Sequence, residues 1–300
     1  MAATLLAFAV VPFGPVEQAP EWLRFIIAPN VDLGLVFIFA VTSLAVYGVI
    51  LGGWASNNKY SALGSLRASA QVVSYEIPLG MSVLGVALLH GTLNLEQLVA
   101  NQAAGGLSGW NIWSQPLAGL IFFVAALAES NRLPFDLAEC EQELVGGFHT
   151  EYSSMKFALF FLGEYTHVVT VGFLMAVLFF GGWHLPFIAE ASSAYAGAWA
   201  VKLLVLLAKV LLTIVLIMLL RWNIPRFRFD QLMGLAWKVM IPLSLANTVL
   251  TMCVLQFGWS RWWLVTGSAV LFIAAGVIGE NAKRSEISRR SRPTVGHAPA

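Results

Sequence analysis

Seven of the sixteen acidic residues of this chain lie between Glu129 and Glu164, in a segment that long apolar stretches flank on both sides. An ionised carboxylate in a low-dielectric surround costs several kcal/mol or more unless it is paired, hydrated or protonated. Such groups are candidates for function, and the chemistry that suits them is proton transfer or the binding of a polar head group. The candidates in this segment are Glu129, Asp136, Glu139, Glu141, Glu143, Glu151 and Glu164.

The spacing inside this segment favours proton exchange. If a helix begins at Pro134, where proline is tolerated in a first turn, then Asp136, Glu139 and Glu143 share one face. Like charges on one face repel, so at least one of their pKa values is expected to rise toward neutrality. Glu141 would face elsewhere, toward Arg132 or a partner protein. The alternative is a solvated cytoplasmic loop whose charges face water, and spacing alone does not decide between the two.

Ionisable residues also occur inside the apolar stretches. Glu76 and Glu164 each lie on an otherwise apolar segment, and each is expected to face the interior of a helical bundle. His167 follows Glu164 by three residues, which is close enough on a helix for a hydrogen bond, although a lone histidine is more often only packed. Lys202 and Lys209 share a helix face, and Lys209 is too deep to reach the interface easily. Together these residues predict a hydrated proton route.

The composition predicts the fold that carries these residues. The chain has 300 residues, of which 58% are hydrophobic and 11% are charged, whereas soluble domains carry roughly 25% charged residues. We therefore expect an all-α, polytopic transmembrane helical bundle as a single domain over residues 1–280. Seven stretches are long enough to cross about 30 Å of hydrocarbon. They lie near 33–53, 71–92, 113–128, 157–182, 199–220, 232–257 and 262–280.

Three further segments complete this predicted organisation. Residues 1–13 are apolar but too short for a full span, and they resemble the second half of one. Residues 129–156 form the acidic loop. Residues 281–300 are polar and contain two prolines, so we expect a disordered tail.

The basic residues predict an orientation. One set of alternate loops, together with the tail, holds twelve of the seventeen lysines and arginines. The positive-inside rule then places the acidic loop and the C-terminus in the cytoplasm, with the chain in a bacterial inner membrane. The net charge of +1 and the scattered basic residues exclude a nucleic-acid partner.

Redox centres and the common catalytic motifs are not expected on this chain. Its two cysteines, Cys140 and Cys253, cannot supply the four thiolates that an iron–sulfur cluster usually takes. We find no GxGxxG, GxxxxGK[ST], HExxH or GxSxG pattern, so we expect no nucleotide, no metal and no acyl enzyme. Any electrons would be carried by another subunit.

Three ordered blocks of sequence carry a resemblance to one family. They are GGWASNNKYSALGSLRASAQVVSYEIPLG at 52–80, AESNRLPFDLAECEQELVGGFHTEYSSMKFALFFLGEY at 128–165 and PRFRFDQLMGLAWKVMIPL at 225–243. On these blocks the chain resembles the H subunit of the proton-pumping NADH:quinone oxidoreductase, respiratory complex I, over roughly residues 1–280. Members of that family normally begin with a further full span and an amphipathic helix. We therefore expect either an upstream start or a fragment.

The resemblance implies a place and a role for the chain. The subunit would lie between the redox arm and the membrane arm, where it forms part of the chamber in which quinone, the substrate, is reduced. NADH, FMN and iron–sulfur clusters would lie on partner subunits, the membrane partners would be small and antiporter-like subunits, and this chain alone would bind no cofactor and catalyse nothing.

The resemblance also assigns residues by position. The acidic loop motif is matched by Glu129, Asp136, Glu139, Glu141, Glu143 and Glu151. Glu76 and Glu164 match the embedded glutamates, which completes the implied proton relay. Lys59, Arg67 and Arg132 match basic residues at the quinone chamber and its loop.

Three other interpretations stay open at this point. The nearest is the homologous membrane subunit of an energy-converting hydrogenase or formate hydrogenlyase, which shares a similar acidic loop. A stand-alone secondary transporter would typically show paired, Gly- or Pro-interrupted spans, and no such pairing is visible. A purely structural membrane anchor leaves Glu76, Glu164 and Lys209 unexplained.

Overall fold

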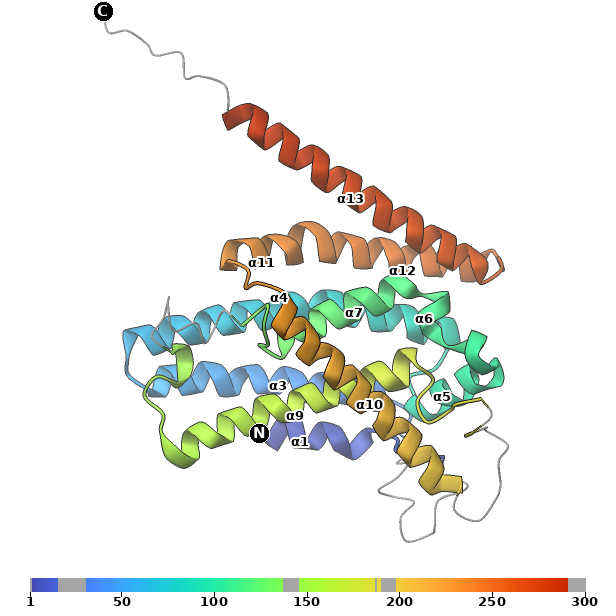
Figure 1. Ribbon diagram of the computed structural model, residues 1–300, viewed down its shortest axis with the longest axis horizontal. Coiled ribbons are helices and arrows are strands. Elements are labelled where there is room, and N and C mark those ends of the chain that lie inside the picture. The colour runs from blue at the N-terminus through green and yellow to red at the C-terminus, as the bar shows by residue number, and fades with distance from the viewer. Residues whose placement is uncertain (1, 16–30, 137–145, 187, 190–197, 291–300) are drawn as a thin grey trace, which may run out of the picture.

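The computed structural model describes residues 2–15, 31–136, 146–186, 188–189 and 198–290, with the backbone alone for 278 and 280–290. The described residues are helical and contain no β-strand apart from one isolated bridge between Leu185 and Ala189. Most helices lie side by side along one direction, while α10 crosses the others obliquely and α13 rises away from them (Figure 1). The predicted all-α, polytopic bundle is confirmed.

The longer helices supply the frame of the bundle. They are α1 (Ala2–Ala7), α3 (Gly34–Ala55), α4 (Lys59–His90), α5 (Leu95–Ala104), α7 (Pro116–Glu129), α9 (Ser154–Phe179), α10 (Ala198–Asn223), α11 (Phe229–Leu235), α12 (Ile241–Gln256) and α13 (Trp262–Arg290). The short turns are η1 (Phe8–Val10), η4 (Gly106–Gly109), α6 (Asn111–Ser114), η5 (Gly147–His149) and the π-helical η6 (Ala236–Met240).

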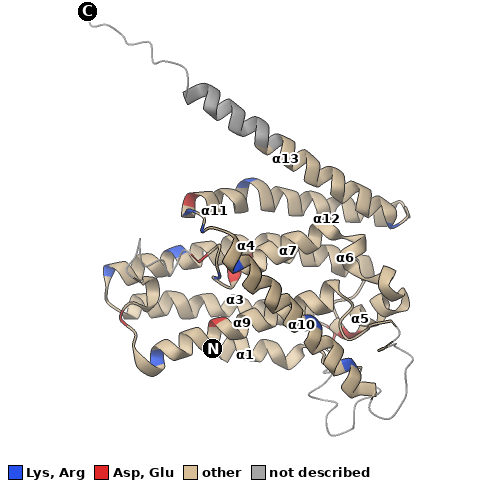
Figure 2. Cartoon of the chain, in the orientation of Figure 1, with Lys and Arg blue, Asp and Glu red and all other residues tan. Residues whose placement is uncertain are grey.

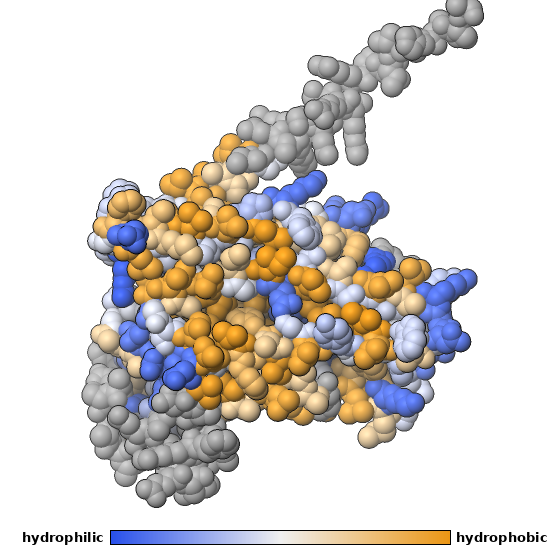
Figure 3. Space-filling model, turned by 180° about the vertical axis from the view of Figure 1, so that it is seen from behind, coloured by the Kyte–Doolittle hydropathy of each residue, from blue (hydrophilic) through white to orange (hydrophobic). Residues whose placement is uncertain are grey.

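Five described helices are long and apolar enough to cross a membrane. They are α3, α4, α9, α10 and the continuous helix Phe229–Gln256, which joins α11 to α12 through the π-helical turn η6. Two shorter apolar helices, Pro116–Glu129 and Trp262–Val277, correspond to the remaining predicted spans. The seven-span count therefore stays a prediction. Apolar side chains cover much of the face seen from behind, as expected for a surface in contact with lipid (Figure 3).

Helix α4 is the central element and packs against α3, α7 and α12. It begins at Lys59, well before the predicted start near residue 71. Asn58 caps the helix, because its side chain accepts a hydrogen bond from the backbone N–H of Tyr60 at 3.0 Å. The first turns are rich in serine and glycine, so a search for apolar runs misses them. Their small residues Ser61, Gly64, Ser65, Ala68 and Ser69 are buried nevertheless, because small residues allow the neighbouring helices to approach closely.

Two further predictions differ from the structure. No helix begins at Pro134 within the described residues: α7 ends at Glu129, and the chain turns so that the N–H of Phe135 donates to the carbonyl of Arg132 at 2.8 Å. A proline there donates no hydrogen bond to continue the ladder of α7. Residues 137–145, which hold the rest of the predicted helix, lie outside the described chain.

The predicted disordered tail is the second difference. The backbone of α13 stays helical to Arg290, past the predicted end of the span at residue 280. The sequence after the apolar part of α13 contains alanine, lysine, arginine and glutamate, which favour helix, and proline first follows at residue 293. Residues 291–300 lie outside the described chain.

The segment that follows the acidic loop is fixed against α3 and α4. Ser61 in α4 donates to the carbonyl of Phe148 in η5 at 2.8 Å. Tyr152 donates to the carbonyl of Gly52 in α3 at 2.8 Å. Gly64 lies so close to η5 that a Cβ would be 2.7 Å from the Cα of Gly147. These contacts determine where α9 begins.

Candidate functional site

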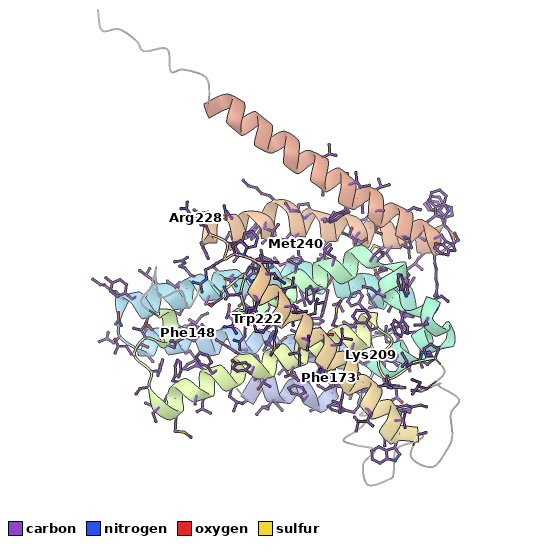
Figure 4. All side chains as sticks on the ribbon, in the orientation of Figure 1. Phe148, Phe173, Lys209, Trp222, Arg228 and Met240 are labelled. Carbon is purple, nitrogen blue, oxygen red and sulfur yellow. The ribbon has the colours of Figure 1, made fainter. Side chains whose placement is uncertain are left out.

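A cavity of about 410 Å³ lies among α1, α3, α9 and the end of α7. This volume falls within the range of small-molecule sites, which are mostly apolar with a few polar groups. Apolar side chains such as Val46 and Phe160 line most of it, and Glu129, Glu164 and His167 supply ionisable groups. Phe148, which also lines it, is labelled in Figure 4.

Glu129 and His167 form a buried pair across this cavity. Oε1 of Glu129, the last residue of α7, lies 3.2 Å from Nε2 of His167 in α9, and the two side chains are only 9% and 10% exposed. Nδ1 of His167 is also buried, with no hydrogen-bond partner among the described residues. A distance of 3.2 Å is within reach of direct proton transfer. The pair can therefore hold a proton on either group.

The predicted contact between His167 and Glu164 is replaced by this pair. Glu164 is three residues away on α9, but the end of α7 presents Glu129 to the imidazole directly. A buried carboxylate without a partner is costly, so Glu129 gains from the nearest donor. Glu164 instead faces Arg132, with Nη2 to Oε2 at 4.0 Å. The Arg132 guanidinium also lies 4.2 Å from the centre of the Tyr165 ring.

The second and third sequence blocks, at 128–165 and 225–243, contact each other where the acidic loop begins. Arg226, just before α11, donates from Nη2 to Oδ2 of Asp136 at 3.0 Å. The rings of Phe135 and Phe227 stack with centroids 5.6 Å apart. Arg67 in α4 lies 4.8 Å from the centre of the Phe229 ring. These contacts connect the start of the acidic loop to α11.

Gln71 in α4 holds the turn after α7. Its Nε2 donates to the carbonyls of Ala128 at 2.8 Å and Phe135 at 2.9 Å, and it lies 3.3 Å from Oδ1 of Asn131. The side chain is 1% exposed. Because these bonds bracket Glu129 in the sequence, Gln71 fixes the position of that carboxylate.

Replacing Gln71 by leucine is expected to weaken this turn. Removing one partner from buried polar groups costs about 1–3 kcal/mol for each group left unsatisfied. We expect the assembled protein to lose thermal stability and part of its substrate turnover. Replacing Gln97, which is exposed on α5, by leucine serves as the control and should leave both unchanged. Equal melting temperatures of the two variants would contradict this role for Gln71.

The remaining predicted site residues lie in different surroundings. Ser43 in α3 donates a hydrogen bond to Glu76 in α4. Glu151 is exposed and accepts from Nδ2 of Asn58 at 2.6 Å, and Lys59 lies 5.2 Å from the centre of the Tyr60 ring. Glu139, Glu141 and Glu143 lie outside the described residues. Within the described chain, the cavity thus brings together Glu129 and Glu164 but neither Glu76 nor Glu151.

Sequence patterns alone miss three features of this arrangement. Helical spacing pairs His167 with Glu164, whereas its partner is Glu129. Arg226 lies far along the chain from Asp136, so only the third sequence block points to it. Gln71 is a polar residue on a helix face between apolar positions, which is the one signal that could have indicated a buried role.

The described residues do not provide a metal or cluster site. They contain no group of three or more His, Cys, Asp or Glu side chains that could hold a metal ion. The one cysteine among them, Cys253, is exposed on α12.

Comparison with known proteins assigns the chain to a family. The family model described as NADH dehydrogenase matches residues 1–252, which include every site residue named above. The chain belongs to this NADH dehydrogenase family. The family resemblance carried by the three sequence blocks is thereby confirmed.

Relatives of the chain share this family and carry closely similar names. The H subunit of NADH-quinone oxidoreductase from Protochlamydia amoebophila is 45% identical over 247 residues, which cover 82% of this chain and 71% of the relative. The H subunit from Leptospira biflexa is 43% identical over 274 residues, covering 88% and 75%. NADH-quinone oxidoreductase subunit 8 of Rhodothermus marinus is 48% identical over 234 residues, covering 76% and 69%.

Proposed function

We propose that this chain is the membrane-embedded H subunit of a proton-translocating NADH:quinone oxidoreductase. Support comes from relatives of that name and from the membrane-length helices. Quinone is the substrate, and NADH, FMN and the iron–sulfur clusters belong to partner subunits. The chain catalyses nothing by itself. These names also favour a quinone enzyme over a hydrogenase as the complex in which the chain works.

The observation that carries the finer proposal is the Glu129–His167 pair on the wall of the 410 Å³ cavity. We infer that the quinone head group enters this cavity. Reduction of a quinone to a quinol takes two electrons, which come from the partner's cluster, and two protons. The pair lies where it can donate one of these protons, because both groups line the cavity and are within transfer distance of each other.

The other acidic residues extend this route in the proposal. Glu164 lines the same cavity beside Arg132, and Asp136 follows at the start of the acidic loop. The remaining members of the proposed relay are Glu76, Glu139, Glu141, Glu143 and Glu151. Carboxylates that interact closely titrate as a group, so charge created at the quinone would redistribute protons along the set.

In this proposal, the main role of the basic residues is to hold segments of the chain in position. Arg67 and Arg132 each lie over an aromatic ring of another segment, at 4.8 and 4.2 Å from its centre. Cation–π contacts of this kind stabilise a fixed approach of two segments. In the proposal they hold the acidic loop and the start of α11 around the quinone chamber, and Lys59 borders it at the start of α4.

The proposed membrane orientation follows the distribution of charge. Basic side chains occur at the beginnings of α4 and α9 and around α11 (Figure 2). Cytoplasmic segments carry the excess of lysine and arginine in membrane proteins. We therefore propose that these ends, the acidic loop and the C-terminus face the cytoplasm of a bacterium, with the bundle in its inner membrane.

Filling the cavity tests whether quinone binds there. Gly48 lines the cavity, and a Cβ at this position would meet no heavy atom within 4 Å. Replacing Gly48 by phenylalanine should raise the KM for quinone by about tenfold or more, since it removes about 1.4 kcal/mol or more of binding. The measurement is steady-state NADH:quinone reduction by the assembled complex.

The control is Gly80→Phe, because Gly80 also has open space at its Cβ position but does not line the cavity. Electron transfer from NADH to a hydrophilic artificial acceptor should stay at the wild-type rate in both variants. Unchanged quinone kinetics in Gly48→Phe, with the complex assembled, would place the quinone elsewhere.

A further inference from the structure

Lys209, in the middle of α10, is enclosed by the chain that follows α9. Its Nζ donates to the backbone carbonyls of Phe180 at 2.7 Å, Gly182 at 2.9 Å and His184 at 2.7 Å. It also lies 4.4 Å from the centre of the Trp110 ring. Figure 4 labels Lys209 on the oblique helix α10. We call this arrangement the lysine cage.

The cage has the geometry that suits a charged lysine. A neutral amine has two N–H groups to donate, whereas an ammonium has three. Three carbonyl oxygens within 2.9 Å of one nitrogen match the three donors of the ammonium form. The face of an indole ring also attracts a cation. No ion pair between Lys209 and a carboxylate is found among the described residues.

Amide side chains form hydrogen bonds with further backbone groups at this end of α9. Gln102 donates to the carbonyl of Val177 at 2.9 Å, and Asn111 donates to that of Leu178 at 2.8 Å. Gln102 also accepts from the N–H of Gly181 at 3.1 Å. Amides do not titrate, so these groups hold the backbone without offering a site to a proton.

Two glycines make the cage geometrically possible. Gly181 and Gly182 have φ angles of +70° and +54°, which side chains other than glycine rarely adopt. A Cβ on Gly181 would lie 2.6 Å from Nε1 of Trp110. The left-handed turn lets the carbonyls of Phe180, Gly182 and His184 converge on Nζ. The sequence GG after α9 is therefore part of the cage.

The cage and the cavity lie toward opposite ends of the bundle. Phe148, on the cavity wall, and Lys209 are well separated along the direction of the helices in Figure 4. Helix α9 connects them, since it carries His167 at the cavity and ends at Phe179 next to the cage. From His167 to Phe179 the helix rises by roughly 18 Å. One end therefore holds proton-binding carboxylates, and the other holds a fixed cation.

We propose that the Lys209 ammonium closes this end of the bundle to protons. A fixed positive group repels protons and other cations electrostatically. Protons bound at the acidic end therefore cannot leave through the opposite end of this subunit, and they remain available for transfer to its partners.

Passive proton leak through the assembled complex tests this proposal. The complex is reconstituted in liposomes, a potassium diffusion potential is imposed without NADH or quinone, and an enclosed dye reports the internal pH. Lys209→Met keeps the length of the side chain but removes the charge, and it should raise the leak rate by about tenfold or more over wild type, as loss of an electrostatic barrier predicts. Lys209→Arg keeps the charge, so its proton leak rate should stay at the wild-type level.

Two controls separate lost charge from loosened packing. Gln102→Leu removes hydrogen bonds from the same end of α9 and keeps the ammonium, so it should stay tight even where it lowers thermal stability. Lys238→Met removes a lysine that is exposed on η6 and should also stay tight. If Lys209→Met fails to assemble, Lys209→Gln replaces it, and Lys209→Arg remains decisive in either case.

The outcomes are distinct from those that bear on the proposed function, because the leak is measured without turnover. A leak in Lys209→Met or Lys209→Gln that is absent from Lys209→Arg and Gln102→Leu supports the proposal. The proposal would be overturned by a wild-type proton leak rate in Lys209→Met, by a raised rate in Lys209→Arg, or by equally raised rates in Lys209→Met and Gln102→Leu. This holds even if quinone binding at the cavity were established.

Discussion

Replacing Glu129 by glutamine is expected to lower quinone-linked turnover of the assembled complex by about a hundredfold and to abolish its proton translocation. Glutamine keeps the size and can still hydrogen-bond to His167, 3.2 Å away, but it cannot carry a proton. Loss of a positioned acid or base typically costs 10²–10⁴-fold in rate, so about a hundredfold is the lower expectation. Turnover is measured as NADH oxidation with quinone, and translocation as quenching of a pH-sensitive dye in liposomes.

Glu96→Gln is the matched control. Glu96 lies in the first turn of α5, away from the cavity, and the same change of charge there should leave turnover and pumping at the wild-type level. His167→Gln should show a loss similar to that of Glu129→Gln, and the double variant should be no worse than either, because groups that act as a unit are not additive. Independent, multiplicative losses would contradict a shared proton.

Gly64→Ala is expected to prevent assembly of an active complex. A Cβ on Gly64 would lie 2.7–2.9 Å from backbone atoms of Gly147 and Phe148, which cannot move aside as a flexible side chain would. Overpacking of this kind costs about 1–3 kcal/mol. The strain would displace η5, and with it the beginning of α9 and the wall of the cavity. The measurements are the amount of intact complex on a native gel and its melting temperature.

Gly80→Ala is the control in the same helix. Its Cβ would meet no heavy atom within 4 Å, so the change should be neutral or should stabilise α4 through the better helix propensity of alanine, by up to about 1 kcal/mol. Equal amounts of complex and equal melting temperatures for the two variants would show that contact between α4 and η5 does not position the cavity.

The class of fold is predictable from the sequence because hydropathy alone reports it. Apolar runs of about 20 residues in a chain with few charges are typical of helices that cross a membrane. The same criterion places the start of α4 too late. One face of residues 59–70, formed by Ser61, Gly64, Ser65, Ala68 and Ser69, is buried by close helix packing, and the hydropathy of these residues gives no sign of that packing.

The candidate site is predictable only in part. An acid beside an apolar run is visible in one sequence, and Glu129 and Glu164 stand out in this way. Their partners depend on which helices meet. Helical spacing favours His167 with Glu164, because it considers neighbours on one helix, whereas α7 brings Glu129 to the imidazole from another.

Contacts between distant segments are beyond such patterns. Asp136 with Arg226 and Gln71 with the turn after α7 join residues far apart in the chain. The lysine cage is similar: depth suggests that Lys209 is not exposed to solvent, but no periodicity indicates three backbone carbonyls converging on its nitrogen. The acids at 139, 141 and 143 lie outside the described residues, so their predicted shared face stays a prediction.

Infrared difference spectroscopy of the assembled complex, recorded between its oxidised and quinone-reduced states, tests the proton-holding pair most directly. If Glu129 and His167 exchange a proton with the cavity, reduction changes the C=O stretch of a protonated carboxyl, and that signal shifts in D₂O and disappears in Glu129→Gln. A wild-type spectrum that matches the Glu129→Gln spectrum throughout the carboxyl region would mean that Glu129 keeps one protonation state during turnover, which contradicts the account.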